Sequence, residues 1–279
     1  MISGTRFRLD LEINQQSRLA QEIARAQSDI ATGKRIQAPS DDPIASGQIA
    51  QLARTQGDEA VWTRNVQAAS LLASSADTAL TSVATAVDRA KELMLTAANG
   101  TTSDDNRATI AAELRDISQQ ISGLRTTLDS RGEPLFRAGS PLEIPVGPGV
   151  HVAPVAGRSE VFDAPIDIVA TIDAAAAAAV EPNPSLRSTA VAASLSALDG
   201  AARQVANAHA DQGLRAARLD KIQNQLADFS IQHEEQRSEL ESTDVTATVA
   251  KLQSRQLSLE AAQGIFARVN RSSLFDLLR

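Results

Sequence analysis

The chain has 279 residues, a formal net charge of -7 and no cysteine. Disulfides, thiolate metal sites and cysteine nucleophiles are therefore excluded. Acidic and basic residues are interspersed without a Lys/Arg block, so we do not expect nucleic acid as a partner. No apolar run approaches the roughly 18 residues that a membrane helix needs, so we expect no membrane span.

The composition favours helices over a wide globular core. Aromatic residues make up only 3% of the chain, and much of the 43% hydrophobic fraction is alanine. Small side chains let helices approach closely, and Ala, Leu, Gln, Arg and Glu are good helix formers. We predict a mainly α protein, with long antiparallel helical bundle or coiled-coil rods built from both ends of the chain and a small β-rich central insert.

Residues 1–43 are predicted to form an N-terminal helical assembly segment and a turn. Ile13, Ile23 and Ile30 recur at heptad-compatible spacings, and Gly33 is a suitable C-cap. The turn is expected at Ser40, Asp41, Asp42 and Pro43, where Ser40 or Asp42 can cap the next helix and Pro43 suits its first turn.

Residues 44–131 are predicted to form the N-terminal half of a helical rod. A seam with alternating spacings of four and three runs from Trp62 to Met94, so we expect a helix over 44–98 that stops before Asn99-Gly100. Ser103 then opens a second patterned helix, which predicts an antiparallel hairpin. Trp62 is interpreted as a packing residue, with an exposed contact role as the alternative.

Residues 132–184 form a Pro/Gly-rich insert. Short runs at 142–146, 151–155, 160–162 and 166–169 are typical of brief strands. Ala174–Ala179 is interpreted as the extension of a short helix begun near Pro165, with a low-complexity linker as the alternative.

Residues 185–242 are predicted to be the C-terminal half of the rod, and 243–279 a C-terminal helical assembly segment. The stretch 186–241 matches the second helix in length, which suggests that the two lie side by side. The terminal seams carry polar gaps at Gln16, Gln27, Gln256 and Gln263. We therefore expect the end helices to be poorly ordered alone and to pack on assembly. A terminal coiled coil that is stable in the monomer is the alternative.

Motifs for chemistry are incomplete. His233-Glu-Glu-Gln-Arg237 has arginine where a zinc-binding HExxH motif needs its second histidine. The Asp41-Asp42 and Asp104-Asp105 pairs each precede a helix, so capping explains them better than acid–base work. We therefore expect no catalytic, metal or cofactor site and no enzymatic activity.

Four stretches carry a family resemblance: Ala31-Thr-Gly-Lys-Arg-Ile36, Pro39-Ser-Asp-Asp-Pro-Ile-Ala45, Gly132-Glu-Pro-Leu-Phe-Arg-Ala-Gly139 and Ser273-Leu-Phe-Asp-Leu277. In this order they resemble the flagellin superfamily of bacterial axial proteins, and within it the hook-filament junction proteins, the third hook-associated proteins. The resemblance implies a structural adaptor of the bacterial flagellum that assembles through its terminal helices. Filament flagellin and a non-flagellar coiled-coil scaffold are the alternatives.

The resemblance also implies partners and a location. The partners would be copies of the same chain in a ring or helical layer, a neighbouring hook-associated protein, flagellin, the flagellar export apparatus and an export chaperone. The location would be extracellular, in the flagellum, reached without a cleaved Sec signal, because the first ten residues carry charges and no apolar run. The predicted assembly contacts are Ile13, Ile23, Ile30, Leu252, Leu259, Phe266, Leu274, Phe275, Leu277 and Leu278.

Overall fold

The structure, a computed structural model, describes the backbone of residues 2–276 and the side chains of residues 10–268. It is mainly helical, as predicted, and divides into two compact units, residues 1–56 with 231–279 and residues 57–230. The elements are α1 Ile2–Thr32, α2 Pro43–Ala98, α3 Asp104–Arg125, β1 Ile144–Gly147, β2 Val150–Val152, the π-helix η1 Ser159–Asp163, α4 Ile168–Ala179, α5 Pro184–Glu241 and α6 Val245–Asp276. None of the helices within the described residues is both long and apolar enough to cross a membrane.

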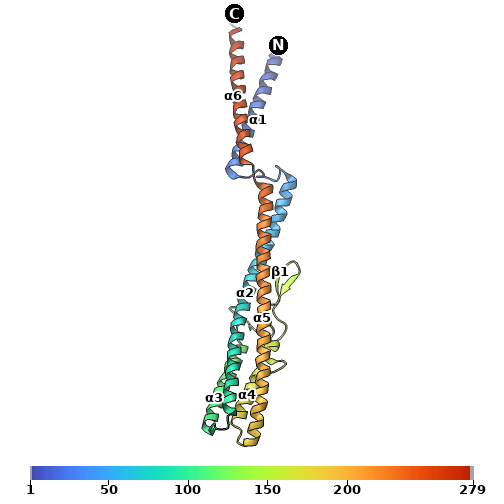
Figure 1. Cartoon of the computed structure of the whole chain (residues 1–279). Coiled ribbons are helices and arrows are strands. Elements are labelled where there is room, and N and C mark those ends of the chain that lie inside the picture. Colours follow the sequence, from blue (N-terminus) through green and yellow to red (C-terminus); the bar gives the residue numbers. More distant parts are fainter. Residues whose placement is uncertain (1, 277–279) are drawn as a thin grey trace. The chain divides into compact units, whose positions relative to one another are not determined.

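In the unit 57–230, α2 and α5 run antiparallel and side by side (Figure 1). The amide of Gln212 donates to the carbonyl of Ala73 at 3.3 Å, and Lys91 pairs with Asp199 at 2.7 Å. The two helices have 56 and 58 residues. Their contacts confirm the side-by-side pairing predicted from their similar lengths.

The predicted α2 seam is the buried side of that helix. The seam positions between Val66 and Met94 are almost fully buried. Trp62 is half-buried and packs against the cluster of buried residues that contains Val66. Several of the seam positions are alanine, and α3 and α4 pack against each other and complete the core. The packing role predicted for Trp62 is confirmed. The buried seam residues are Val66, Ala69, Ala73, Ala76, Leu80, Val83, Val87, Ala90 and Met94.

Local capping explains where the helices of this unit begin. Ser103 accepts a hydrogen bond from the amide of Asn106, and Asn183 accepts from the amide of Ser185. The buried Arg107 donates to the carbonyl of Ala97, which is left open at the end of α2, and to the carbonyl of Thr102 in the turn that follows.

The insert contains two strands rather than four. β1 and β2 form an antiparallel hairpin that packs on α2 and α5 through Val146 and Val152. The strand predicted at 160–162 is wrong, because these residues lie in η1, where Phe162 meets Phe136 edge-on at 5.1 Å.

The strand predicted at 166–169 is also wrong. Asp167 accepts from the amide of Ala170 and starts α4 there, which confirms the helix predicted near Pro165 and contradicts the linker. The buried Gln204 of α5 holds this turn, because its amide donates to the carbonyls of Val161 and Ile166 at 3.1 and 3.0 Å.

Candidate assembly site at the paired ends

The unit of residues 1–56 and 231–279 contains two turns that bond to each other. The first joins α1 to α2 (residues 33–42) and the second joins α5 to α6 (residues 242–244); with Glu241 we call them the turn pair. Gly33, at φ +69°, accepts the amide of Thr243 at 3.0 Å, and the amide of Arg35 donates to the carbonyl of Glu241 at 2.7 Å. Lys34 and Ser242 form an isolated antiparallel bridge between these contacts.

Side chains reinforce the turn pair. Lys34 Nζ lies 2.7 Å from Glu241 Oε2, and Arg237 donates to Glu241 Oε1 at 3.1 Å. The guanidinium of Arg35 donates to the carbonyl of Leu240 at 3.3 Å. The hydrogen bond from Lys34, ahead of that from Arg237, lowers the pKa of Glu241 below its ordinary value. The carboxylate therefore stays ionised and bound at neutral pH.

The predicted turn residues Ser40 to Pro43 make different contacts. Asp41 pairs with Arg25 of α1 at 2.7 Å and accepts the amides of Gln37 and Ala38, each at 3.0 Å. The hydrogen bond from Arg25, followed by those two amides, holds the pKa of Asp41 far below its usual range.

Between the two capping candidates, the structure selects Asp42. Its Oδ1 accepts the amide of Ala45 at 3.0 Å, and Pro43 is the first residue of α2. Ser40 lies exposed in the turn.

Helices α1 and α6 pack against each other along a seam. On α1 the half-buried positions recur at spacings of four and three, and the predicted Ile23 and Ile30 are among them. Leu19, which the sequence analysis missed, belongs to the same series, whereas Ile13 is 49% exposed. Heptad spacing groups residues on one face of a helix but does not say which face a partner helix covers. Ile13 lies on a face of α1 that α6 does not cover. The half-buried series is Glu12, Gln16, Leu19, Ile23, Ala26 and Ile30.

On α6, the half-buried positions of the seam also recur at spacings of three and four. The predicted Leu252, Leu259 and Phe266 are half-buried, as are Arg255 and Ala262 between them. Arg255 forms an ion pair with Glu22 of α1. Of the polar seam positions expected from the sequence, Gln16 is half-buried in the α1 series, whereas Gln27, Gln256 and Gln263 are exposed. An ion pair at one seam level favours one register of the two helices.

Large apolar residues remain on the outside of the pair. We call them the outer apolar set; they are Leu11 and Ile13 on α1 and Val245, Leu257 and Ile265 on α6. Water contacts these side chains in the single chain, so a neighbouring molecule that covered them would gain hydrophobic free energy. The predicted contacts Leu274 and Phe275 lie outside the described side chains, and Leu277 and Leu278 lie outside the described residues.

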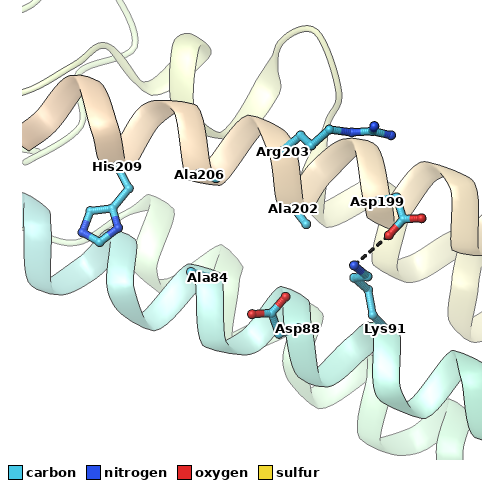
Figure 2. Close-up of a pocket in the computed structure, with 8 residues that line it drawn as sticks. All are labelled: Ala84, Asp88, Lys91, Asp199, Ala202, Arg203, Ala206 and His209. Carbon is cyan, nitrogen blue, oxygen red and sulfur yellow. Dashed lines mark ion pairs between the residues drawn. The ribbon is translucent and has the colours of Figure 1, made fainter.

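A groove of about 600 Å³ lies between α2 and α5 in the unit 57–230. Figure 2 shows Ala84 of α2 and Ala202 and Ala206 of α5 along it, with Lys91 paired to Asp199 at one side. The small side chains leave this space open between the helices. No group of three or more His, Cys, Asp or Glu residues that could hold a metal occurs within the described residues.

Two family models match the segments that meet at the turn pair. The bacterial flagellin N-terminal helical region matches residues 11–140, and the bacterial flagellin C-terminal helical region matches residues 195–278. Together the two ranges cover most of the chain. The chain belongs to the bacterial flagellin family.

Two curated relatives show which flagellar proteins this flagellin-family chain is similar to. It is 29% identical over 286 residues to flagellar hook-associated protein 3 of Escherichia coli K12, a match that covers 89% of this chain and 90% of that protein. It is 36% identical over 107 residues to flagellar hook-associated protein 3 of Salmonella typhimurium, covering 38% of this chain and 34% of that protein. The chain is a structural component of the bacterial flagellum.

Solved structures show the same fold. A flagellar hook-associated protein from Vibrio parahaemolyticus aligns with a TM-score of 0.67 at 24% identity, covering 72% of this chain and 100% of that one. FlgL from Xanthomonas campestris aligns with a TM-score of 0.60 at 14% identity, covering 67% and 99%. The flagellar junction protein FlgL from Legionella pneumophila gives 0.54 at 14%, covering 69% and 100%.

The flagellin-family matches divide the turn pair between them. Residues 33–42 lie in the N-terminal match and residues 241–244 in the C-terminal match, whereas the hairpin, η1 and α4 lie outside both. The contacts of the turn pair explain what the Thr-Gly-Lys-Arg and Ser-Asp-Asp-Pro motifs do in the structure. The motif residues that make these contacts are Gly33, Lys34, Arg35, Asp41 and Asp42.

Proposed function

We propose that this chain is the structural adaptor between the hook and the filament of the bacterial flagellum, and that it assembles through its paired terminal helices. The observation that carries the proposal is the outer apolar set on α1 and α6, on segments that match the flagellin terminal regions. The names of the two curated relatives support the junction as its place.

In this proposal the seam and the outer apolar set have different roles. Leu19, Ile23 and Leu259 pair α1 with α6 inside one chain. Ile13 and Leu257 face outward and contact neighbours, which are copies of this chain, a neighbouring hook-associated protein and flagellin. The turn pair fixes where α1 ends and where α6 begins, so the exposed side chains of α1 and α6 are presented together.

We further propose that the chain reaches the extracellular flagellum through the flagellar export apparatus, assisted by an export chaperone and without a cleaved Sec signal. A cysteine-free chain suits this route, because no disulfide can form before or during passage as an unfolded polypeptide.

Deletion of the gene in its host tests the adaptor function. We expect electron microscopy to show hooks without filaments, and the growth medium to contain flagellin monomers that had no surface on which to assemble. Hooks without filaments and without shed flagellin would instead identify the chain as the filament subunit. Normal flagella would contradict the proposed function.

Truncation after Asn270 tests the terminal helices themselves. The shortened chain should still be secreted and should keep the fold of residues 57–230, but it should not enter the flagellum. Immunoblots of the medium and of isolated flagella measure both quantities, with the full-length chain as the control. Normal assembly of the truncated chain would contradict the role of the C-terminal segment.

A further inference from the structure

The exposed residues Leu71 and Leu214 in the unit 57–230 have positions that can be related through the contact between α2 and α5. Leu71 on α2 is 72% exposed and Leu214 on α5 is 70% exposed, which makes them the two most exposed leucines among those described. Single exposed leucines are common and indicate nothing by themselves. These two are informative because the contact between α2 and α5 fixes where each one lies.

The contact between Gln212 and Ala73 sets the level of both leucines. Because the helices are antiparallel, Leu71, two residues before Ala73, and Leu214, two residues after Gln212, are displaced in the same direction by about 3 Å. Two residues also turn an α-helix through about 200°, so each leucine points away from the partner helix. Leu71 and Leu214 therefore lie at one level on opposite sides of the helix pair.

Leu71 forms one wall of a groove of about 360 Å³. Ala68 and Leu72 of α2 and Ile144 of β1 supply the rest of its apolar lining. The groove is open to solvent and its lining has no charged group on the α2 side, so it suits an aliphatic side chain.

The rim of the groove is ordered and carries balanced charge. Asp129 pairs with Arg131 at 2.8 Å and also accepts the amides of Arg131 and Glu133 at 2.8 and 3.0 Å. The side chain of Arg131 remains more than half exposed. It can therefore receive a second carboxylate from an occupant of the groove.

We propose that Leu214 of one copy of this chain inserts into the Leu71 groove of a neighbouring copy. The exposed Asp211, one turn before Leu214, brings a carboxylate toward Arg131 at the rim. Knob and groove lie on opposite sides of one chain, so the contact is heterologous and repeats from copy to copy. Because they lie at one level, each repeat adds no shift along the helices, and the series can close into a ring. The inference rests on the proposed function, which requires copies of the chain side by side.

Cysteine crosslinking tests the contact in assembled flagella. The chain has no cysteine, so introduced thiols are the only ones in it that can react. Leu71→Cys and Leu214→Cys are placed on separate copies and produced together in a host that lacks the native chain, and isolated hook–filament structures are mildly oxidised. We expect a covalent dimer when both variants are present and none when either is produced alone.

Leu95→Cys provides the matched control. Leu95 is also an exposed leucine of α2, but it lies 24 positions beyond Leu71, about 36 Å along the helix. Combined with Leu214→Cys it should give no dimer. Equal yields from the control, a dimer from Leu71→Cys alone, or no dimer although the chain is present in isolated flagella would each overturn the inference. Absence of the chain from flagella would overturn the proposed function and the inference with it.

Discussion

At the scale of single residues, the turn pair shows why charged residues cluster at the ends of these helices. Asp42 caps α2, Asp41 binds Arg25 and two backbone amides, and Glu241 receives Lys34. Asp41 and Asp42 satisfy backbone donors that the turn and the helix end leave open, whereas the carboxylate of Glu241 binds the cationic side chains of Lys34 and Arg237. These roles are structural, and the sequence predicts capping of this kind for the Asp41-Asp42 pair.

Replacement of Asp42 by alanine should destabilise the turn pair. The amide of Ala45 would lose its partner, and loss of a helix N-cap costs about 1 kcal/mol. Denaturant unfolding followed by far-UV circular dichroism measures the change. Ser40→Ala is the control, since Ser40 is exposed and does not cap α2. An equal loss in both variants would contradict the assignment of the cap to Asp42.

Glu241→Gln should change how stability depends on pH. The folded-state pKa of Glu241 is lowered, so its contribution is present above the unfolded value of about 4.3 and is lost as pH falls through the lower folded value. At pH 7 the variant should be less stable by roughly 1 kcal/mol, and its melting temperature should fall less steeply as the pH drops below the unfolded-state pKa of about 4.3. Glu239→Gln, at an exposed neighbouring position, is the control and should follow the native profile.

At the scale of the elements, the pairing of α1 with α6 depends on which face of each helix is covered. Both helices carry apolar residues on more than one face. Among the large apolar side chains described, those in the series with Leu19, Ile23 and Leu259 are half-buried, and those of the outer apolar set are exposed. The Glu22–Arg255 ion pair adds a fixed register. The two faces can therefore be changed separately.

Leu19→Ser and Ile13→Ser should separate helix pairing from assembly. Leu19→Ser exposes a polar group on the seam, so we expect lower helix content of the purified chain and reduced entry into flagella. Ile13→Ser changes an exposed side chain, so helix content should stay unchanged while entry into flagella falls several-fold. Circular dichroism and immunoblots of isolated flagella measure the two effects. A loss of helix content as large in Ile13→Ser as in Leu19→Ser would show that the faces are assigned wrongly.

At the scale of the whole molecule, the chain divides into a unit with two clusters of buried apolar residues and a unit built from its ends. The fully buried large side chains, such as Leu80, Phe136, Phe162 and Leu198, all belong to residues 57–230. The side chains of α1 and α6 that are described are at most half-buried. The five-segment division of the sequence, with boundaries after 43, 131, 184 and 242, remains a prediction.

A fragment of residues 57–230 should therefore fold without the ends. Its apolar core lies within the fragment, so we expect a cooperative thermal transition and high helix content. A matched fragment of residues 104–230 removes α2 and should lose cooperativity, because the buried α2 side of the core is absent. Non-cooperative melting of the longer fragment would contradict the independence of this core.

The sequence by itself determined the helices, most of their caps and the buried seam of α2, because these depend on residues a few positions apart. The same reasoning found Asp42 and Gly33 at a turn and the family motifs around them. Only the tertiary structure decided that Lys34 binds Glu241, that Leu19 rather than Ile13 lies on the seam, and that Phe162 lies in a π-helix held by Gln204. These outcomes depend on partners up to about 200 positions away, and a periodic pattern marks an apolar face without naming what covers it.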